Sequence, residues 1–380
     1  VVSVAADDMD PHTEFIYCCG AATELLKFGS SPLSSEDKLL FLVVPGNPGV
    51  VGFYRTFMQN LHRLSGRPVW AVSHAGHSKR PDGFSLTDAS AAERDDVLGL
   101  NGQVEHKLAF LRRHVPIGTR LVLVGHSIGC YMILEMLKRN PELKVLKAIL
   151  LFPTIERMAQ SPQGKVMTPV LCQMRYLAYL PVFLLSLLPG AVQALLVRLV
   201  LTDFIPPAAN SMYLGGQEMR KVLERDNLTI EKNLDKLIFY YGAADHWCPV
   251  TYFHDIRRDF PQGDFQLCDK GFRHAFVLDA GQEVAQMVDS KTLLNAATVY
   301  MSMAATRPTS LLAALRAHAA LITRTMRAGS GRWWIEMLEW NLKRNGLLIS
   351  EIYDAVWADF RFHYRNGTSP SARIKCLFLT

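Results

Sequence analysis

The stretch Leu121–Leu137, LVLVGHSIGCYMILEML, joins four aliphatic residues to a glycine-containing turn and then to a second apolar segment with a different spacing. The aliphatic run Leu121–Val124 is typical of a strand that is covered on both faces. The segment after the turn predicts a helix. A strand followed by Gly-x-Ser-x-Gly and a helix is the pattern of a nucleophile elbow, a sharp turn that holds a serine hydroxyl above the edge of a sheet.

Ser127 is the candidate nucleophile of this turn, and its neighbours have separate roles. Gly125 and Gly129 leave room where side chains would collide with the neighbouring strand and helix. The backbone amide of Ile128 is expected at a helix N-terminus, directed toward the negative charge that forms on an attacked carbonyl oxygen. An inert turn serine is the alternative, but the position of the motif between a strand and a helix favours a nucleophile.

A serine hydroxyl needs a base to take its proton and an acid to orient that base. Where this elbow occurs, the chain order is serine, acid, histidine. The candidate acid is Asp245, which ends the apolar pattern LIFYYGAAD, and the candidate base is His274 in DKGFRHAF. The alternatives are Asp255 or Asp259 as the acid, in the helical pattern that follows, and a surface-loop role for His274. We expect Ser127, Asp245 and His274 to meet at one edge of the sheet.

The second donor of an oxyanion hole is expected in the loop VVPGNPG, which follows the third predicted strand. Gly46 allows a close approach of the backbone, and Asn47 offers its amide N–H. Pro48 has no N–H to donate. The alternative interpretation is a proline and glycine turn with no further role.

The remaining histidines and the cysteines give little sign of a metal site. His74 and His77, in SHAGHS, have no third ligand beside them, so a structural loop is favoured. His126 fills the variable position of the elbow and is expected to support the turn. The seven cysteines contain no C-x-x-C pair and suit reduced thiols in the cytosol. We therefore expect neither a metal nor an organic cofactor.

Up to about residue 290, short β-rich runs alternate with longer helical patterns. This alternation predicts an α/β fold with a mostly parallel central sheet and helices on both faces. The first two strands read as a hairpin. The expected strands lie in EFIYCCG, TELLKFG, LLFLVVPG, PVWAVSHAG, LVLVGHS, KAILLFP, LIFYYGAAD and FQLC.

Composition narrows the class of protein. With 380 residues, of which 49% are hydrophobic, the chain can bury a large core. A net charge of +6 spread along the chain does not predict nucleic-acid binding, although it permits attraction to an anionic membrane surface. The acidic start VVSVAADDMDPHTEF is unlike a secretory signal, so secretion is not expected.

The segment 176–197 is uncharged, and its 22 residues are long enough to span a bilayer. Pro181 and the pair Pro189–Gly190 favour two short helices instead, in a hairpin that enters a phospholipid monolayer without crossing it. The alternative is an apolar cap that packs only on its own domain.

The chain resembles the lipid droplet-associated hydrolases of the α/β-hydrolase superfamily over about residues 11–290. The motifs that carry the resemblance are VVPGNPG, SHAGH, LNGQVEHKLAFL, VGHSIGCYM, LLFPTIERMAQSP, YLGGQEM, FYYGAADHWCP and HAF. The resemblance implies a serine hydrolase at the surface of lipid droplets and on the cytosolic face of the endoplasmic reticulum. It implies sterol esters, or other neutral lipid esters such as acylglycerols, as substrates. It also implies Ser127 as nucleophile, Asp245 as acid and His274 as base.

Four regions are expected. Residues 1–154 form the first part of the hydrolase core with the elbow, and residues 155–232 form an apolar helical cap with the lipid-binding hairpin, between the sixth and seventh strands. Residues 233–290 complete the core with the acid and the base. Residues 291–380 form a basic helical extension without an assigned role. The region 183–213 is shorter than the family pattern.

These observations predict an esterase that cleaves neutral lipid esters with Ser127, His274 and Asp245. A non-catalytic droplet protein, which affects droplet size or lipid storage by binding, is the competing hypothesis. Transfer of the acyl group to an alcohol instead of water would use the same residues. The sequence does not determine the oligomeric state.

Overall fold

The computed structural model describes residues 10–29, 39–78, 96–173 and 205–289. All of them belong to Val1–Leu293, the first of two units of the chain. The predicted lipid-binding segment 176–197 and the extension 291–380 lie outside the described residues.

The described residues form an eight-stranded sheet in the order β1-β2-β4-β3-β5-β6-β7-β8. The strands are β1 (His12–Cys18), β2 (Ala21–Phe28), β3 (Leu39–Val44), β4 (Val69–Val72), β5 (Arg120–His126), β6 (Val145–Leu151), β7 (Leu237–Gly242) and β8 (Asp264–Cys268). Strands β1 and β2 are an antiparallel hairpin, and β2 is antiparallel to β4. All pairs from β4 to β8 are parallel. The predicted α/β fold, with its opening hairpin and mostly parallel sheet, is confirmed.

Strand β5 lies in the middle of the sheet, between β3 and β6. Val124 is aligned with Val43 of β3 and with Ile149 of β6, and all three side chains are buried. Parallel strands that are covered on both faces need continuous apolar runs, which explains the aliphatic residues before the elbow. The serine that follows β5 is therefore attached to a central, buried strand of the sheet.

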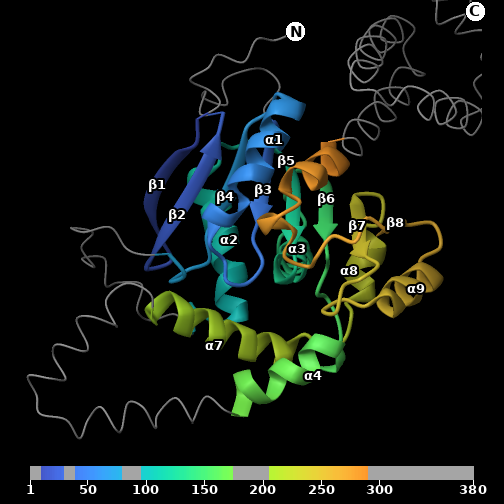
Figure 1. Ribbon diagram of the computed structural model, residues 1–380. Coiled ribbons are helices and arrows are strands. Elements are labelled where there is room, and N and C mark those ends of the chain that lie inside the picture. The colour runs from blue at the N-terminus through green and yellow to red at the C-terminus, as the bar shows by residue number, and fades with distance from the viewer. Residues whose placement is uncertain (1–9, 30–38, 79–95, 174–204, 290–380) are drawn as a thin grey trace, which may run out of the picture. The chain divides into compact units, whose positions relative to one another are not determined.

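Helices cover both faces of the sheet. The longer ones are α1 (Arg55–Ser65), α2 (Leu100–His114), α3 (Ile128–Arg139), α4 (Pro162–Thr168), α7 (Ile205–Lys221), α8 (Asn227–Lys232) and α9 (Val250–Asp259). Short helical turns are η2 (Val51–Tyr54), η4 (Met158–Gln160), η5 (Pro169–Gln173) and η7 (Phe276–Leu278). Helices α2 and α3 pack together on one face, and α1 lies on the other (Figure 1).

Local sequence sets several helix ends. Helix α1 ends at Gly66, which has the left-handed φ of 65° that glycine tolerates without a Cβ clash. Helix α4 begins after Ser161, whose side chain accepts a hydrogen bond from the Gly164 amide, and has Pro162 in its first turn. Asp226 caps α8 in the same way through the Thr229 amide.

Helices α4 and α7 come between β6 and β7 in the chain and lie beyond the carboxyl ends of the parallel strands, at the bottom of Figure 1. Helix α7 is held to the core by polar contacts. Asn210 Nδ2 donates to the Gly76 carbonyl at 2.6 Å, and Gln217 Oε1 accepts from the Leu100 amide at 3.0 Å. Within the described ranges, no helix has both the length and the apolar character needed to cross a membrane.

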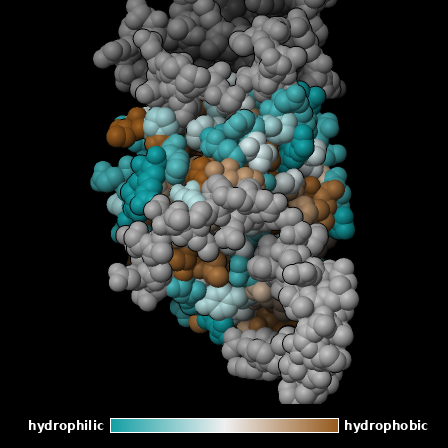
Figure 2. Space-filling model, turned by 90° about the vertical axis from the view of Figure 1, so that its left-hand side faces the viewer, coloured by the Kyte–Doolittle hydropathy of each residue, from teal (hydrophilic) through white to brown (hydrophobic). Residues whose placement is uncertain are grey.

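Strand β1 is an edge of the sheet and lies on the side that faces the viewer in Figure 2. The coloured surface there is mostly hydrophilic, with hydrophobic residues in separate patches. Lys27 and Glu14 form an ion pair of 2.5 Å across β1 and β2. Charged side chains on an edge strand discourage pairing with another chain.

Candidate active site

The serine of the elbow lies at the junction of β5 and α3. Ser127 has φ 54° and ψ −123°, an unusual conformation for a residue with a side chain, of a kind that costs about 1–3 kcal/mol. Its amide donates to the Leu151 carbonyl at 3.0 Å, which holds the turn to β6. A Cβ at Gly129 would lie 2.2 Å from the Val44 carbonyl oxygen, and one at Gly125 would lie 2.9 Å from Ile133 Cδ1. Both glycines are thus required by close packing.

Three side chains that are far apart in the sequence meet at the carboxyl edge of the sheet. Asp245 follows β7, and His274 lies between β8 and η7. The Ser127 hydroxyl is 2.8 Å from His274 Nε2. His274 Nδ1 is 2.7 Å from Asp245 Oδ2. These contacts form a continuous path for a proton from the serine to the imidazole, with the carboxylate behind it.

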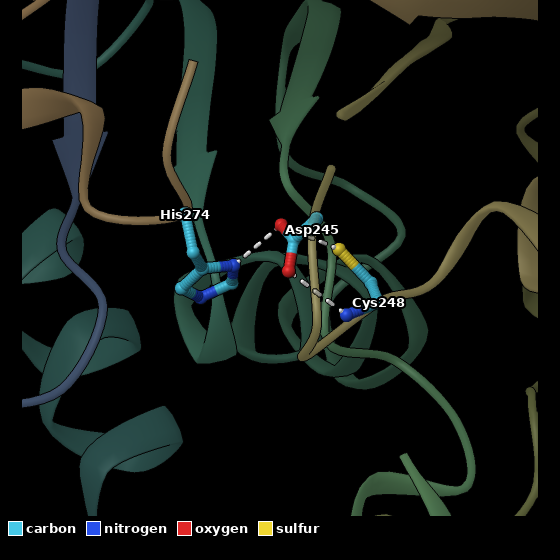
Figure 3. Close-up of side chains that lie close together, drawn as sticks. All are labelled: Asp245, Cys248 and His274. Atoms are coloured by element: carbon cyan, nitrogen blue, oxygen red, sulfur yellow. Dashed lines mark hydrogen bonds and ion pairs between the residues drawn. The ribbon is translucent and has the colours of Figure 1, made fainter. Parts of the chain in front are cut away.

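The Asp245 carboxylate is buried and accepts several hydrogen bonds. Oδ1 accepts from the Trp247 amide at 2.7 Å and from the Cys248 amide at 3.2 Å. Oδ2 also accepts from the Cys248 thiol at 3.1 Å (Figure 3). Burial by itself raises the pKa of Asp245, but the charge and hydrogen bond of His274 and the bonds from Cys248 and Trp247 outweigh it, so that the pKa is lowered. The carboxylate is therefore ionised at neutral pH.

The two alternative acids lie elsewhere, on α9. Asp255 Oδ2 is 2.8 Å from Arg157 Nη2, and the hydrogen bond from this arginine lowers the pKa of Asp255. Asp259 is paired with Arg225 and with Arg258. Both carboxylates belong to surface ion pairs, and neither is a hydrogen-bond partner of His274.

The predicted oxyanion donors have free amides near the serine. Neither Asn47 N nor Ile128 N has a hydrogen-bond acceptor within the described part of the chain. Ile128 is the first residue of α3, so its N–H has no acceptor within the helix, and the helix dipole favours negative charge there. Asn47, Ser127 and His274 line one cavity. The geometry is suited to an anion on a tetrahedral intermediate.

A chain of buried hydrogen bonds connects the Asn47 loop to the base. The Gly46 amide donates to the Tyr54 hydroxyl at 2.7 Å, and this hydroxyl donates to His126 Nδ1 at 2.7 Å. His126 Nε2 donates to the His274 carbonyl at 2.8 Å. His126 was expected to support only the turn, and it also reaches the loop of His274. Sequence reasoning missed Tyr54, because nothing in the pattern of α1 and η2 marks that hydroxyl.

The two histidines of SHAGHS lie under the Asn47 loop. His77 Nδ1 donates to the Pro48 carbonyl at 2.6 Å, and the His74 amide donates to the Gly49 carbonyl at 3.0 Å. Burial lowers the pKa of His77 to about 4 and that of His74 well below its usual value. Both rings are neutral supports of the loop. This position agrees with the prediction from the sequence that His74 and His77 belong to a structural loop.

Asp245, Cys248 and His274 also satisfy the spacing of metal ligands, with donor atoms within 4.8 Å of one another. These atoms are joined by hydrogen bonds, in which the Cys248 thiol and His274 Nδ1 both donate to the carboxylate. A thiol that keeps its proton is not a metal ligand, and burial raises the pKa of Cys248 well above its usual value. The cluster is thus arranged for holding the imidazole.

The cavity above Ser127 has a volume of about 270 Å³ and lies between the elbow and the helices α4, η5 and α7. Its lining is mainly apolar and rich in methionine. Besides Pro48, the apolar residues of the lining are Met158, Met167, Leu171, Met212, Met219 and Trp247. Flexible thioether side chains adapt to apolar ligands of varied shape.

Comparison with known families identifies relatives of this chain. A family model described as lipid-droplet associated hydrolase matches residues 37–277. The lipid droplet-associated hydrolase of Gallus gallus is 53% identical over 311 residues, which cover 75% of this chain and 96% of that protein. The lipid droplet-associated hydrolase of Homo sapiens is 48% identical over 308 residues, 74% of this chain and 95% of that protein.

Solved structures show the same architecture. A haloalkane dehalogenase from Bradyrhizobium elkani aligns with a TM-score of 0.52 and 13% identity, over 76% of this chain and 99% of that chain. At this identity the likeness concerns the fold alone. The eight-stranded sheet, with helices on both faces and the elbow after β5, is the α/β-hydrolase fold.

Proposed function

This chain belongs to the lipid droplet-associated hydrolase family, and on that premise we propose that it is a serine esterase that cleaves carboxylic esters of neutral lipids. The observation that carries the proposal is the pair of hydrogen bonds, 2.8 Å and 2.7 Å, that joins Ser127 to His274 and His274 to Asp245. This arrangement is that of a nucleophile, its base and the group that orients the base.

In the first half of the reaction, Ser127 Oγ forms a bond to the ester carbonyl carbon while its proton passes to His274 Nε2. Asp245 keeps the other proton on Nδ1 and stabilises the imidazolium. The oxyanion accepts hydrogen bonds from the Asn47 and Ile128 amides. The C–O bond to the alcohol then breaks, and the alcohol leaves with the proton from Nε2.

In the second half, water attacks the acyl-serine and gives its proton to His274 Nε2. The C–O bond to Ser127 breaks as the serine takes that proton back, and a carboxylic acid is released. The proposed reaction steps require neither a metal nor an organic cofactor. Cys248, Trp247 and the His126 chain keep the groups in place.

A neutral lipid ester is the proposed substrate class, with sterol esters and acylglycerols as the candidates. The support is the apolar, methionine-rich cavity beside Ser127, together with the names of the relatives. An acyl chain gains about 0.8 kcal/mol for each CH₂ group removed from water.

We place the protein at the lipid droplet surface and on the cytosolic face of the endoplasmic reticulum. We assign residues 155–232 as the cap over the two parts of the core, 1–154 and 233–290.

The lipid-binding role of 176–197 is argued from sequence alone and has its own test. Fused to a fluorescent protein, this segment is expected to concentrate at droplets in lipid-loaded cells. The control is the same fusion with Leu184, Leu185, Leu187 and Leu188 changed to serine, which loses apolar area for burial. A diffuse signal from the unaltered segment would contradict the role.

Labelling with a fluorophosphonate probe tests the catalytic proposal. The purified protein should be labelled and should hydrolyse a fatty acyl ester, and Ser127→Ala should do neither. Ser65→Ala, on α1 away from the cavity, is the matched control and should behave as wild type. Absence of labelling in folded wild-type protein would support the non-catalytic hypothesis instead. Products formed with an added alcohol acceptor would separate hydrolysis from acyl transfer.

A further inference from the structure

One side of α7 lies along the side chain of Asn47. Ser211, Gly215 and Glu218 follow one another at spacings of four and three and so share a helix face. Asn47 Nδ2 donates to the Ser211 carbonyl at 2.8 Å and to Glu218 Oε1 at 3.0 Å. These two bonds use both N–H groups of the amide, so the helix fixes the orientation of the Asn47 side chain.

Glycine at position 215 allows this close approach. A Cβ there would lie 3.4 Å from Asn47 Nδ2 and 3.1 Å from Leu171 Cδ1. A Cβ would thus already be in contact with the Asn47 amide, and Leu171 would have to shift by a few tenths of an ångström. Ser211, Gly215 and Glu218 on this face of α7 thus surround the side chain of Asn47.

Glu218 is an unusual residue on this face, because its side chain is buried and no described residue forms an ion pair with it. The residue is only 3% exposed, and its hydrogen-bond partner in the described part of the chain is Asn47. Acidic side chains are rarely buried unless they are paired. Burial raises the pKa of Glu218 to about 7, although the hydrogen bond from Asn47 opposes this rise.

We propose that Glu218 is a positioning residue that, through the Asn47 side chain, holds the Asn47 backbone N–H where the oxyanion forms. This inference rests on the proposed function, since it assigns a role within the same reaction. The two hydrogen bonds tie the Asn47 side chain to α7, and this tether restrains the Cα atom of Asn47 and the backbone N–H beside it. Small displacements of such a donor weaken the stabilisation of the transition state more than the binding of the ester.

The neutral form of Glu218 is the one compatible with this role. A carboxylate beside Asn47 would oppose the negative charge that develops on the substrate oxygen. On α7 itself, Arg220 is exposed and the Lys221 ammonium donates to Gln217 Oε1 at 2.8 Å. From the loop packed against α7, Asn47 is the group that faces the carboxyl. Within the described residues, burial and Asn47 are the two influences on this pKa.

Two substitutions separate the hydrogen bond from the charge. Glu218→Ala removes the acceptor, and we expect kcat to fall about tenfold or more with a KM within about twofold of wild type. Glu218→Gln keeps an acceptor oxygen and should restore kcat. In wild type, kcat should decline as Glu218 ionises with rising pH, and the Gln variant should lack this decline. Glu224 is an exposed residue just after α7, and Glu224→Ala is the matched control, whose kcat should equal that of wild type.

A double-mutant cycle tests the route through Asn47. Asn47→Ala keeps the backbone N–H but loses the side chain, so Glu218→Ala should have no further effect on kcat in that background. If the effects of the two substitutions simply multiply, Glu218 does not act through Asn47 and the inference is wrong. Equal kcat values for Glu218→Ala and wild type would also overturn it.

Hydrogen exchange provides a measurement that needs no turnover. In Glu218→Ala, amides of the segment 44–52 should exchange faster than in wild type, while those of β7 should be unchanged. Unchanged exchange in this segment would overturn the inference. An unreactive wild-type protein would overturn the proposed function, and the exchange experiment would still decide whether Glu218 holds the loop.

Discussion

The Nε2 atom of His126 lies 2.8 Å from the carbonyl oxygen of His274 and so connects the elbow to the loop of the proposed base. Because a carbonyl only accepts, Nε2 carries the proton and Nδ1 accepts from the Tyr54 hydroxyl. Burial and the neighbouring His274 together lower the pKa of His126 to about 3, so the ring is neutral at physiological pH. The His274 carbonyl and the Tyr54 hydroxyl together fix this tautomer.

Tyr54→Phe should therefore impair both catalysis and stability. The substitution leaves the buried Gly46 amide and His126 Nδ1 without their partner, which costs about 1–3 kcal/mol of the free energy of unfolding. We expect kcat to fall by about tenfold, because the loops of Asn47 and His274 lose a shared support. Ester hydrolysis and denaturant unfolding measure the two effects.

Tyr240→Phe is the matched control for this substitution. The Tyr240 hydroxyl donates to the Met287 carbonyl at 3.3 Å and makes no contact with the site. It should lose stability without loss of kcat at temperatures where it is folded. An equal loss of kcat in both variants would mean that Tyr54 acts through stability alone.

Asp245→Asn should reduce kcat by roughly 10³-fold to 10⁴-fold. An amide can still accept from the Trp247 and Cys248 amides, so the turn should keep its shape. The amide cannot stabilise the imidazolium and favours the wrong tautomer of His274. Steady-state kinetics of this variant measure the effect.

Asp255→Asn tests the alternative acid with the same change of charge. Asp255 lies on α9 and its carboxylate pairs with Arg157, so the variant should keep kcat within a fewfold of wild type. If Asp255→Asn were inactive and Asp245→Asn active, the assignment of the acid would be reversed. Circular dichroism of both variants excludes loss of fold as the cause.

Cys248→Ala should reduce kcat less than Asp245→Asn does, because it removes only one hydrogen bond to the Asp245 carboxylate. The thiol donates one of the bonds to Asp245 Oδ2, at 3.1 Å, while the two backbone amides remain. We expect kcat to fall by less than about tenfold, since a single weak donor is lost. Cys248→Ser keeps a donor and should recover most of the rate, whereas no difference between the two variants would show that the thiol only fills space.

Sequence predicted the strands and the elbow well because their signals are local. The apolar run before Ser127 and the glycines on each side of it are written in consecutive residues. The meeting of Ser127, Asp245 and His274 was also predictable, because each follows a parallel strand and these strands end at the same edge. Their catalytic roles stay a prediction.

The supports of the site could not be predicted in the same way. Glu218 is 171 residues from Asn47 in the chain, whereas Tyr54 follows the Asn47 loop in the helical turn η2, and the contacts of both depend on how their segments pack. A tyrosine or glutamate at a helical position is most simply a surface or core residue. Only the folded chain brings their side chains to the Asn47 loop.

The buried histidines should make the protein sensitive to acid. Burial lowers the pKa of His77 to about 4, whereas an exposed histidine in the unfolded chain has a pKa near 6.5. Between these values the unfolded state binds more protons, so stability is present above about pH 6.5 and is lost as the pH falls toward 4. At about 1.4 kcal/mol for each pKa unit, His77 contributes roughly 3 kcal/mol to this loss.

His77→Asn keeps a donor for the Pro48 carbonyl but cannot become charged in this range. Its free energy of unfolding should therefore decline less than that of wild type between pH 6.5 and 4. His254→Asn, an exposed histidine of α9, should decline as wild type does. If the free energy of unfolding of His77→Asn and of wild type declined equally over this pH range, protonation of His77 would not be a cause of the acid sensitivity.

Lys107 predicts a second region of the pH curve, above neutral pH, in which the free energy of unfolding again rises with pH. Its side chain is 0% exposed, with Nζ 2.8 Å from the Ser73 carbonyl oxygen and 3.0 Å from His106 Nδ1. Burial lowers the pKa of Lys107 to about 7 from an ordinary value of 10.5. Between these values the unfolded chain binds more protons than the folded one, so the free energy of unfolding should rise with pH, by about 2 kcal/mol from pH 7 to 9.

Lys107→Met removes the titrating amine while keeping a side chain of similar length, so this rise should be lost. The exposed Lys144→Met is the matched control and should keep the wild-type slope. Measurements should stop near pH 9, because burial raises the pKa of Cys130 and Cys248 and their ionisation in the unfolded chain reverses the sign at higher pH. A wild-type slope in Lys107→Met would show that the buried amine is already charged at pH 9 in the folded protein.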